Sequence, residues 1–117
     1  MVLKRKIICF DIDNVICKTS KSNYKNSKPI PEAIKKINQL YSKKYNIILF
    51  TSRFMGRTKD NRFKAKKLGY KLTKKQLSIW GVKYNKLIMG KPSYDLLIDD
   101  LSIYFKKNWI KDIDKYL

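Results

Sequence analysis

The sequence contains no histidine and only two cysteines. The absence of histidine excludes a histidine base, a histidine nucleophile and a histidine-ligated metal, and it leaves carboxylates as the candidate acids and bases. Cys9 and Cys17 form no Cys-x-x-Cys pair, so we expect neither a disulfide nor a zinc site, and Cys9 should pack as a small apolar residue in a strand. The sequence also has no signal-peptide pattern and no apolar run long enough to cross a bilayer. We therefore expect a cytoplasmic protein with no membrane partner.

Acidic residues are scarce, with nine Asp and Glu against 28 Lys and Arg, and the formal net charge is +19. Such a charge concentrates anionic partners near the surface. The basic residues are mostly Lys, however, and they form no dense Arg cluster or aromatic-basic platform. This distribution favours a compositional bias over nucleic-acid recognition. The length of 117 residues fits one domain, which we expect to span residues 1–117.

Four of the nine acidic residues end apolar stretches. Asp11 and Asp13 follow the apolar residues 7–10, and Asp99 and Asp100 follow residues 96–98. Aspartate is a poor strand former, and two neighbouring carboxylates repel each other unless a cation lies between them. A hard divalent cation is the simplest explanation for the first pair. A turn cap at Asp11 is the alternative, but it explains only one of the two residues.

Apolar periodicity predicts strands that alternate with helices. The strands are expected at 5–11, 46–51, 86–89 and 95–99, and the helices at 31–44, 58–68, 74–80 and after Asn108. Gly69 should end the second helix, Thr73 to Gln76 fit a capping box for the third, and the polar stretch 18–29 should be a loop. The fold class is therefore α/β, a three-layer Rossmann-like parallel sheet with helices on both faces.

Ligands of such sheets bind beyond the carboxyl ends of the strands. The polar residues expected at these ends are Asp11, Asp13, Thr51, Lys91, Asp99 and Asp100. Carboxylates can hold Mg²⁺, one carboxylate can attack phosphorus, and a hydroxyl and an ammonium group can bind phosphoryl oxygens. Taken singly, Thr51 would be an ordinary turn residue, Lys91 a solvated lysine, and Asp99 and Asp100 caps of the following turn.

Four segments resemble the ordered motifs of the haloacid dehalogenase-like superfamily of aspartate-nucleophile phosphatases. They are F-D-I-D-N-V at 10–15, I-I-L-F-T-S-R at 47–53, Lys91 in G-K-P, and L-L-I-D-D at 96–100. The resemblance implies that Asp11 is the nucleophile and that Asp13 protonates the leaving oxygen and then deprotonates water. The second aspartate implies phosphate rather than carbon-halogen chemistry.

The same resemblance implies roles for the other motif residues. Thr51 would hydrogen-bond the phosphoryl group, and Lys91 would balance the charge of Asp11 and the phosphate. Mg²⁺ would bind Asp11, the backbone carbonyl of Asp13, and Asp99, with Asp100 helping directly or through water. The chain departs from the family at Asn14-Val15, where Gly-Thr is usual, and Asn enters left-handed conformations less freely than Gly.

The gaps between the motifs are too short to hold the cap domain of larger family members. A capless site is open, so the substrate, a small phosphorylated molecule, can carry a bulky and anionic remainder. Alternatively, a second subunit of a homo-oligomer covers the site. The candidate substrate-binding residues lie near the motifs and are Asn14, Ser52, Arg53, Arg57 and Lys59. For the basic residues among them, simple surface charge is the alternative explanation.

The stretch 72–92 resembles small capless members associated with bacterial surface-polysaccharide and nucleotide-sugar synthesis, which implies a sugar phosphate or a sugar-linked phosphomonoester as substrate. Two other interpretations remain. The protein could be a polynucleotide-end phosphatase that uses its positive charge, or a basic nucleic-acid-binding module on an inactive phosphatase scaffold. A signalling receiver domain is disfavoured because its acidic pair precedes its phosphorylated aspartate.

Overall fold

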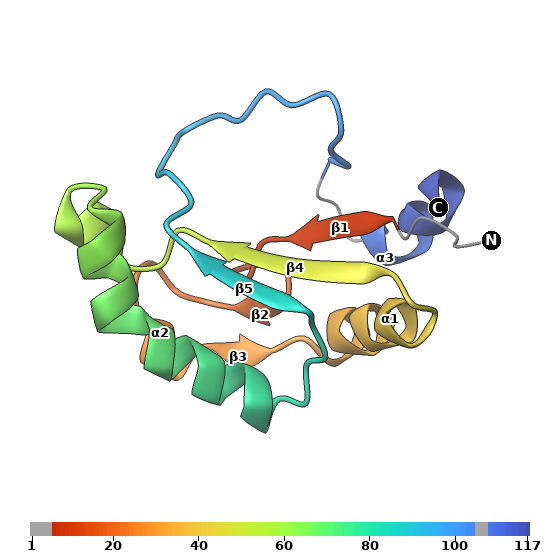
Figure 1. Ribbon diagram of the computed structural model, residues 1–117, viewed down its shortest axis with the longest axis horizontal. Coiled ribbons are helices and arrows are strands. Elements are labelled where there is room, and N and C mark those ends of the chain that lie inside the picture. The colour runs from red at the N-terminus through yellow and green to blue at the C-terminus, as the bar shows by residue number, and fades with distance from the viewer. Residues whose placement is uncertain (1–5, 105–107) are drawn as a thin grey trace.

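The computed structural model describes residues 6–104 and 108–117 and has an α/β architecture (Figure 1). A three-stranded parallel sheet has the order β1-β4-β5, with β1 at Ile7–Phe10, β4 at Asn46–Thr51 and β5 at Lys86–Met89. The expected strands at 46–51 and 86–89 are confirmed. The first strand is shorter than the expected 5–11, of which residue 5 lies outside the described residues.

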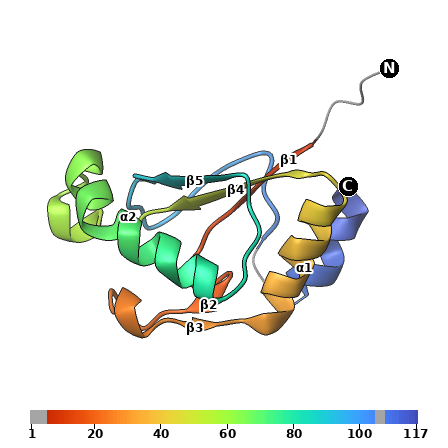
Figure 2. The same cartoon turned by 60° about the horizontal axis from the view of Figure 1, so that its bottom comes forward.

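One face of this sheet carries the core. The parallel register aligns Ile8 with Ile47 and Phe10 with Leu49. The side chains of Ile47, Phe10 and Leu49 are buried. Helices α1 (Pro31–Ser42) and α2 (Arg62–Ile79) lie on the same side of the sheet (Figure 2). Helix α3 (Trp109–Asp112), followed by a 3-10 turn at Ile113–Tyr116, packs near α1 and places the Trp109 ring 5.7 Å from that of Phe10.

The opposite face of the sheet is less covered. Ile48 and Phe50 alternate with the buried residues of β4 and are only half-buried. Cys9, on the same face of β1, is exposed, in contrast to the packed position expected for it. Within residues 6–104 and 108–117 the helices cover one face, so the expected three-layer arrangement is not confirmed. None of the helices in this part of the chain is long and apolar enough to cross a membrane.

Helix α2 is one continuous helix, although two helices separated at Gly69 were expected. Gly69 is buried inside α2, and a side chain at this position would collide with the ring of Phe54. A glycine that serves close packing looks the same in a sequence as a glycine that ends a helix. The supposed capping box at Thr73 to Gln76 is likewise wrong, because both residues lie in the helix interior and are buried.

The polar stretch 18–29 is more ordered than the expected loop. Strands β2 (Cys17–Lys18) and β3 (Lys28–Pro29) pair antiparallel, and a 3-10 turn at Tyr24–Asn26 connects them. The side-chain amide of Gln76 donates a hydrogen bond of 2.6 Å to the Tyr24 carbonyl. This contact attaches the β2–β3 connection to helix α2.

The strand expected at 95–99 is wrong. Residues 91–104 contain no helix or strand and form a long arch from the end of β5 (Figure 1). Leu96, Ile98 and Leu101 are 78%, 90% and 90% exposed. The apolar run is typical of a buried strand, but a strand also needs a hydrogen-bonded neighbour, and none of the described strands pairs with this segment.

Candidate functional site

Asp11 and Lys91 form an ion pair beyond the carboxyl ends of β1 and β5. The Nζ atom of Lys91 donates a hydrogen bond of 3.1 Å to Oδ2 of Asp11. The other carboxylate oxygen, Oδ1, accepts a 2.8 Å hydrogen bond from the backbone amide of Ile12. The Asp11 side chain is 35% exposed. The carboxylate is therefore oriented by two donors and still accessible to a ligand.

The backbone after β5 brings Lys91 to this position. Gly90 adopts a φ of 93°, which favours glycine, and the Lys91 amide donates a 3.0 Å hydrogen bond to the Thr51 carbonyl of β4. The ammonium also lies 5.1 Å from the centre of the Tyr94 ring. Burial lowers the pKa of Lys91, but Tyr94 and Asp11 outweigh this effect and the pKa is raised. Lys91 is therefore a fixed positive charge at neutral pH.

Thr51 is the last residue of β4, and Asn14 lies in the turn that follows Asp13. Thr51 is fully buried at the end of β4, and its Oγ1 accepts a 3.1 Å hydrogen bond from the Arg53 amide, a contact that does not use the hydroxyl proton. Asn14 has a φ of 64°, and its Oδ1 accepts from the Thr19 amide at 3.2 Å. Asn14 therefore adopts the left-handed conformation despite the departure from glycine, and its side chain stabilises the turn.

The Asp13 carboxylate points toward a buried arginine. Its Oδ1 accepts hydrogen bonds from Arg53 Nη2 at 2.9 Å and from Thr19 Oγ1 at 2.6 Å, and its Oδ2 accepts from Arg53 Nε at 3.0 Å. Arg53 is only 1% exposed. Arg53 was expected to bind an anionic substrate, and this expectation is corrected because its guanidinium lies inside the protein.

The other candidate substrate-binding residues face outward to different degrees. Arg57 is exposed, donates a 3.0 Å hydrogen bond to the Ser22 carbonyl, and lies over the rings of Tyr24 and Phe54. Lys59 is exposed after the 3-10 turn at Gly56–Thr58, and Ser52 is half-buried. Arg57 and Lys59 remain accessible to an anionic ligand.

The second acidic pair does not join the first. Asp99 and Asp100 are exposed on the arch, and Asp99 Oδ1 accepts a 2.9 Å hydrogen bond from the Leu101 amide, which is the turn-capping contact considered as the alternative. Within the part of the chain that the structure describes, no group of three or more His, Cys, Asp or Glu side chains could hold a metal ion. The arrangement therefore does not fit the expected Mg²⁺ site.

The sequence did not point to the polar side chains that surround Arg53. Thr73 and Gln76 are three residues apart on α2, so they share a face of the helix, and both are buried. In the sequence this spacing fits a helix cap as well as a shared helix face, and it does not indicate that the two side chains are buried. Thr19 and Ser27, from the stretch expected to be a loop, complete the cluster. Nearby, burial raises the pKa of the Cys17 thiol, which keeps it neutral.

The comparison with protein-family models gives no match, and no curated protein matches the sequence significantly. The chain is similar in structure to the crystal structure of a structural-genomics target from Vibrio cholerae. The TM-score is 0.78, and the alignment covers 95% of this chain and 98% of that chain at 21% sequence identity. This likeness supports the α/β fold and carries no information on activity.

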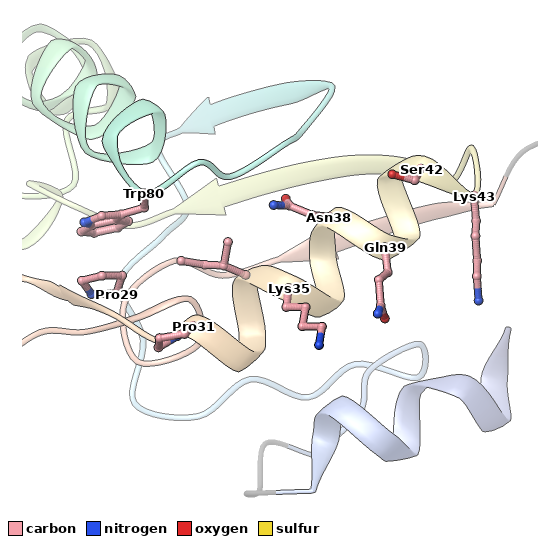
Figure 3. A pocket seen from close by; sticks show the side chains of 9 residues that line it. Pro29, Pro31, Lys35, Asn38, Gln39, Ser42, Lys43 and Trp80 are labelled. Atoms are coloured by element: carbon pink, nitrogen blue, oxygen red, sulfur yellow. The ribbon is translucent and has the colours of Figure 1, made fainter.

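An open groove of about 860 Å³ lies apart from these residues, along α1 and beside Trp80 (Figure 3). Its lining includes none of the candidate catalytic residues Asp11, Asp13, Thr51 and Lys91. The lining residues are Pro29, Pro31, Ile34, Lys35, Asn38, Gln39, Ser42, Lys43 and Trp80. Asn38 serves the local structure, since it accepts a hydrogen bond from the Lys83 amide and donates one to the Gly81 carbonyl.

Proposed function

We propose that the protein is a phosphomonoester hydrolase that forms an aspartyl phosphate on Asp11. The observation that carries the proposal is the Asp11–Lys91 pair, in which an accessible carboxylate is held beside a fixed cation at the ends of two parallel strands. A cation at this position lowers the repulsion between an anionic nucleophile and an anionic phosphate. The resemblance of the motifs supplies the reaction class.

In the proposed first step, an Asp11 oxygen bonds to phosphorus while the ester P–O bond breaks. The leaving oxygen takes a proton from Asp13, and Lys91 neutralises charge on the phosphoryl oxygens. In the second step, water attacks phosphorus, Asp13 accepts its proton, and the phosphorus–Asp11 bond breaks to release phosphate. The Thr51 hydroxyl is proposed to donate to the phosphoryl group, for which small movements at the end of β4 are required because Thr51 is buried.

Mg²⁺ is proposed as the cofactor from the resemblance alone. When bound, such an ion neutralises phosphate charge and favours attack by an anion. Asp11 and Asp13 lie at the site, but Asp99 and Asp100 lie on the arch, so binding would require residues 91–104 to change position. The finer description of the fold, a three-layer Rossmann-like core without a cap, is proposed from the same resemblance.

We propose a sugar phosphate or a sugar-linked phosphomonoester as substrate, following the resemblance of residues 72–92. The exposed Arg57 and Lys59 are available for the anionic remainder of a bulky substrate.

The test is phosphate release from 4-nitrophenyl phosphate and from a panel of sugar phosphates, with and without Mg²⁺. We expect Mg²⁺-dependent release by the wild type and a loss of at least about 10³-fold in Asp11→Asn, because the amide is not a nucleophile. Release that Asp11→Asn leaves unchanged would disprove the nucleophile assignment. Glu32→Gln, on exposed α1 surface, is the control for the loss of one carboxylate and should retain activity.

A further inference from the structure

The cluster around Arg53 contains a charged side chain that is almost completely buried and to which the reaction steps proposed above give no role. Removing a guanidinium from water is costly unless its hydrogen bonds are replaced. Here the replacement is complete, since no buried side-chain nitrogen or oxygen among the described residues lacks a partner. Arg53 is buried, so it does not contribute to the solubility of the surface, and its burial with this many partners indicates another role.

The guanidinium is held from the side opposite Asp13. Nη1 of Arg53 donates to Gln76 Oε1 at 2.5 Å and to Thr73 Oγ1 at 3.3 Å, so both anchors come from α2. Nη2 also donates to Ser27 Oγ at 3.3 Å, and the carbon Cζ lies 5.1 Å from the centre of the Tyr24 ring. The plane and position of the guanidinium are thus fixed by two segments of the chain, α2 and the β2–β3 connection.

With its position fixed, Arg53 presents Nε and Nη2 to the Asp13 carboxylate at 3.0 Å and 2.9 Å. A two-pronged contact of this kind restrains the orientation of the carboxylate as well as its location. The main chain of the same residue donates to the Thr51 hydroxyl at 3.1 Å. One residue therefore restrains two of the groups that the proposed reaction uses.

From this geometry we infer that Arg53 is a positioning residue, which holds the Asp13 carboxylate in the orientation needed for proton transfer. Thr73 and Gln76 act with it, because they fix the guanidinium. The inference rests on the proposed function, and it assigns to Arg53 a role different from substrate binding. Lysine at this position keeps the charge but presents a single ammonium, so the orientation of Asp13 is no longer restrained.

Proton transfer to the leaving oxygen matters for an alkyl or sugar phosphate and much less for 4-nitrophenyl phosphate, whose leaving group departs without a proton. The test measures kcat/KM for both substrates, since this parameter reports the step in which the ester bond breaks. General acid catalysis contributes about 10²- to 10⁴-fold, so we expect Arg53→Lys to lower kcat/KM for the sugar phosphate at least about tenfold more than for the aryl phosphate.

The control for a general loss of stability is Leu40→Ala, which creates a cavity in the core contributed by α1, away from Asp13. At a temperature where this variant is still folded, it should lower kcat/KM for the sugar phosphate and for the aryl phosphate by the same factor. In an Asp13→Asn background, Arg53→Lys should cause no further selective loss. Equal losses on both substrates in Arg53→Lys, or a selective loss that persists without Asp13, would overturn the inference.

Folding of each variant is checked by circular dichroism. If Arg53→Lys does not fold, Gln76→Met and Thr73→Val each remove one anchor of the guanidinium, and the same selective loss is expected at a smaller size. The absence of selectivity in both folded variants would contradict the inference. A wild type that hydrolyses neither substrate would overturn the proposed function and this inference with it, whereas an active wild type with unselective variants overturns the inference alone.

Discussion

Gly69 lies inside α2 against the ring of Phe54, and Met89 of β5 is the next neighbour. A methyl group at this position would overlap the Phe54 ring, and Phe54 is itself buried with Met55 and Ala65 in a small cluster. We expect Gly69→Ala to lower the free energy of unfolding by about 1 to 3 kcal/mol, since overpacking outweighs the higher helix propensity of alanine. Denaturant unfolding of the two proteins measures the difference.

Gly56 provides the matched control, because a side chain at this position meets no atom within 4 Å and its φ is not positive. Gly56→Ala should change the free energy of unfolding by less than about 1 kcal/mol, in the stabilising direction. If Gly69→Ala is as stable as the wild type, the close approach of α2 to Phe54 is not the reason for the glycine.

At the scale of elements, local patterns were sufficient for β4, β5 and α1. Their apolar periodicity and the proline at the first turn of α1 lie within each segment. The same reasoning failed at 95–99, because strand formation depends on a neighbour that is distant in sequence. It also failed for Arg53. The sequence shows that an arginine occupies this position, but its side chain points into the protein because of partners from α2 and from the β2–β3 connection, which are distant in sequence.

The arch formed by residues 91–104 is the element whose exposure is unusual. It carries several large apolar side chains in solvent, and β1, which Asp11 directly follows, lies at the edge of the sheet. Proposed Mg²⁺ binding requires Asp99 or Asp100 to approach Asp11, which would bring this apolar run to β1. We expect Mg²⁺ to slow amide hydrogen exchange in β1 and in residues 95–100 by about tenfold or more.

Asp99→Asn should remove this effect of Mg²⁺ without changing exchange in α1, which serves as the internal reference. Exchange that is the same with and without Mg²⁺ in the wild type would contradict the proposed metal site at this pair of segments. Mg²⁺-dependent phosphate release without slower exchange would place the metal on other ligands.

At the scale of the whole molecule, the net charge of +19 is spread over a compact body with a radius of gyration of 14.4 Å. Ion pairs such as Lys36–Asp114, at 2.7 Å on the surface, neutralise little of it. Such a surface attracts any polyanion, so binding of nucleic acid would not by itself distinguish a polynucleotide-end phosphatase from a sugar-phosphate hydrolase. Phosphate release at raised salt does distinguish them, because non-specific binding through several phosphate contacts weakens steeply as the salt concentration increases.

We expect the affinity for a 5′-phosphorylated oligonucleotide to fall by about 10³-fold or more between 50 mM and 200 mM salt, as for non-specific contacts with several phosphates. Over the same range, kcat/KM for a sugar phosphate should change much less, since one phosphate is held by the short-range Asp11–Lys91 arrangement. Fluorescence anisotropy and phosphate release measure the two quantities in the same buffers.

Preferential release of the oligonucleotide end phosphate at 200 mM salt would instead favour the polynucleotide-end phosphatase. Oligonucleotide binding that survives Asp11→Asn, with no turnover of any substrate by the wild type, would favour a binding module on an inactive scaffold.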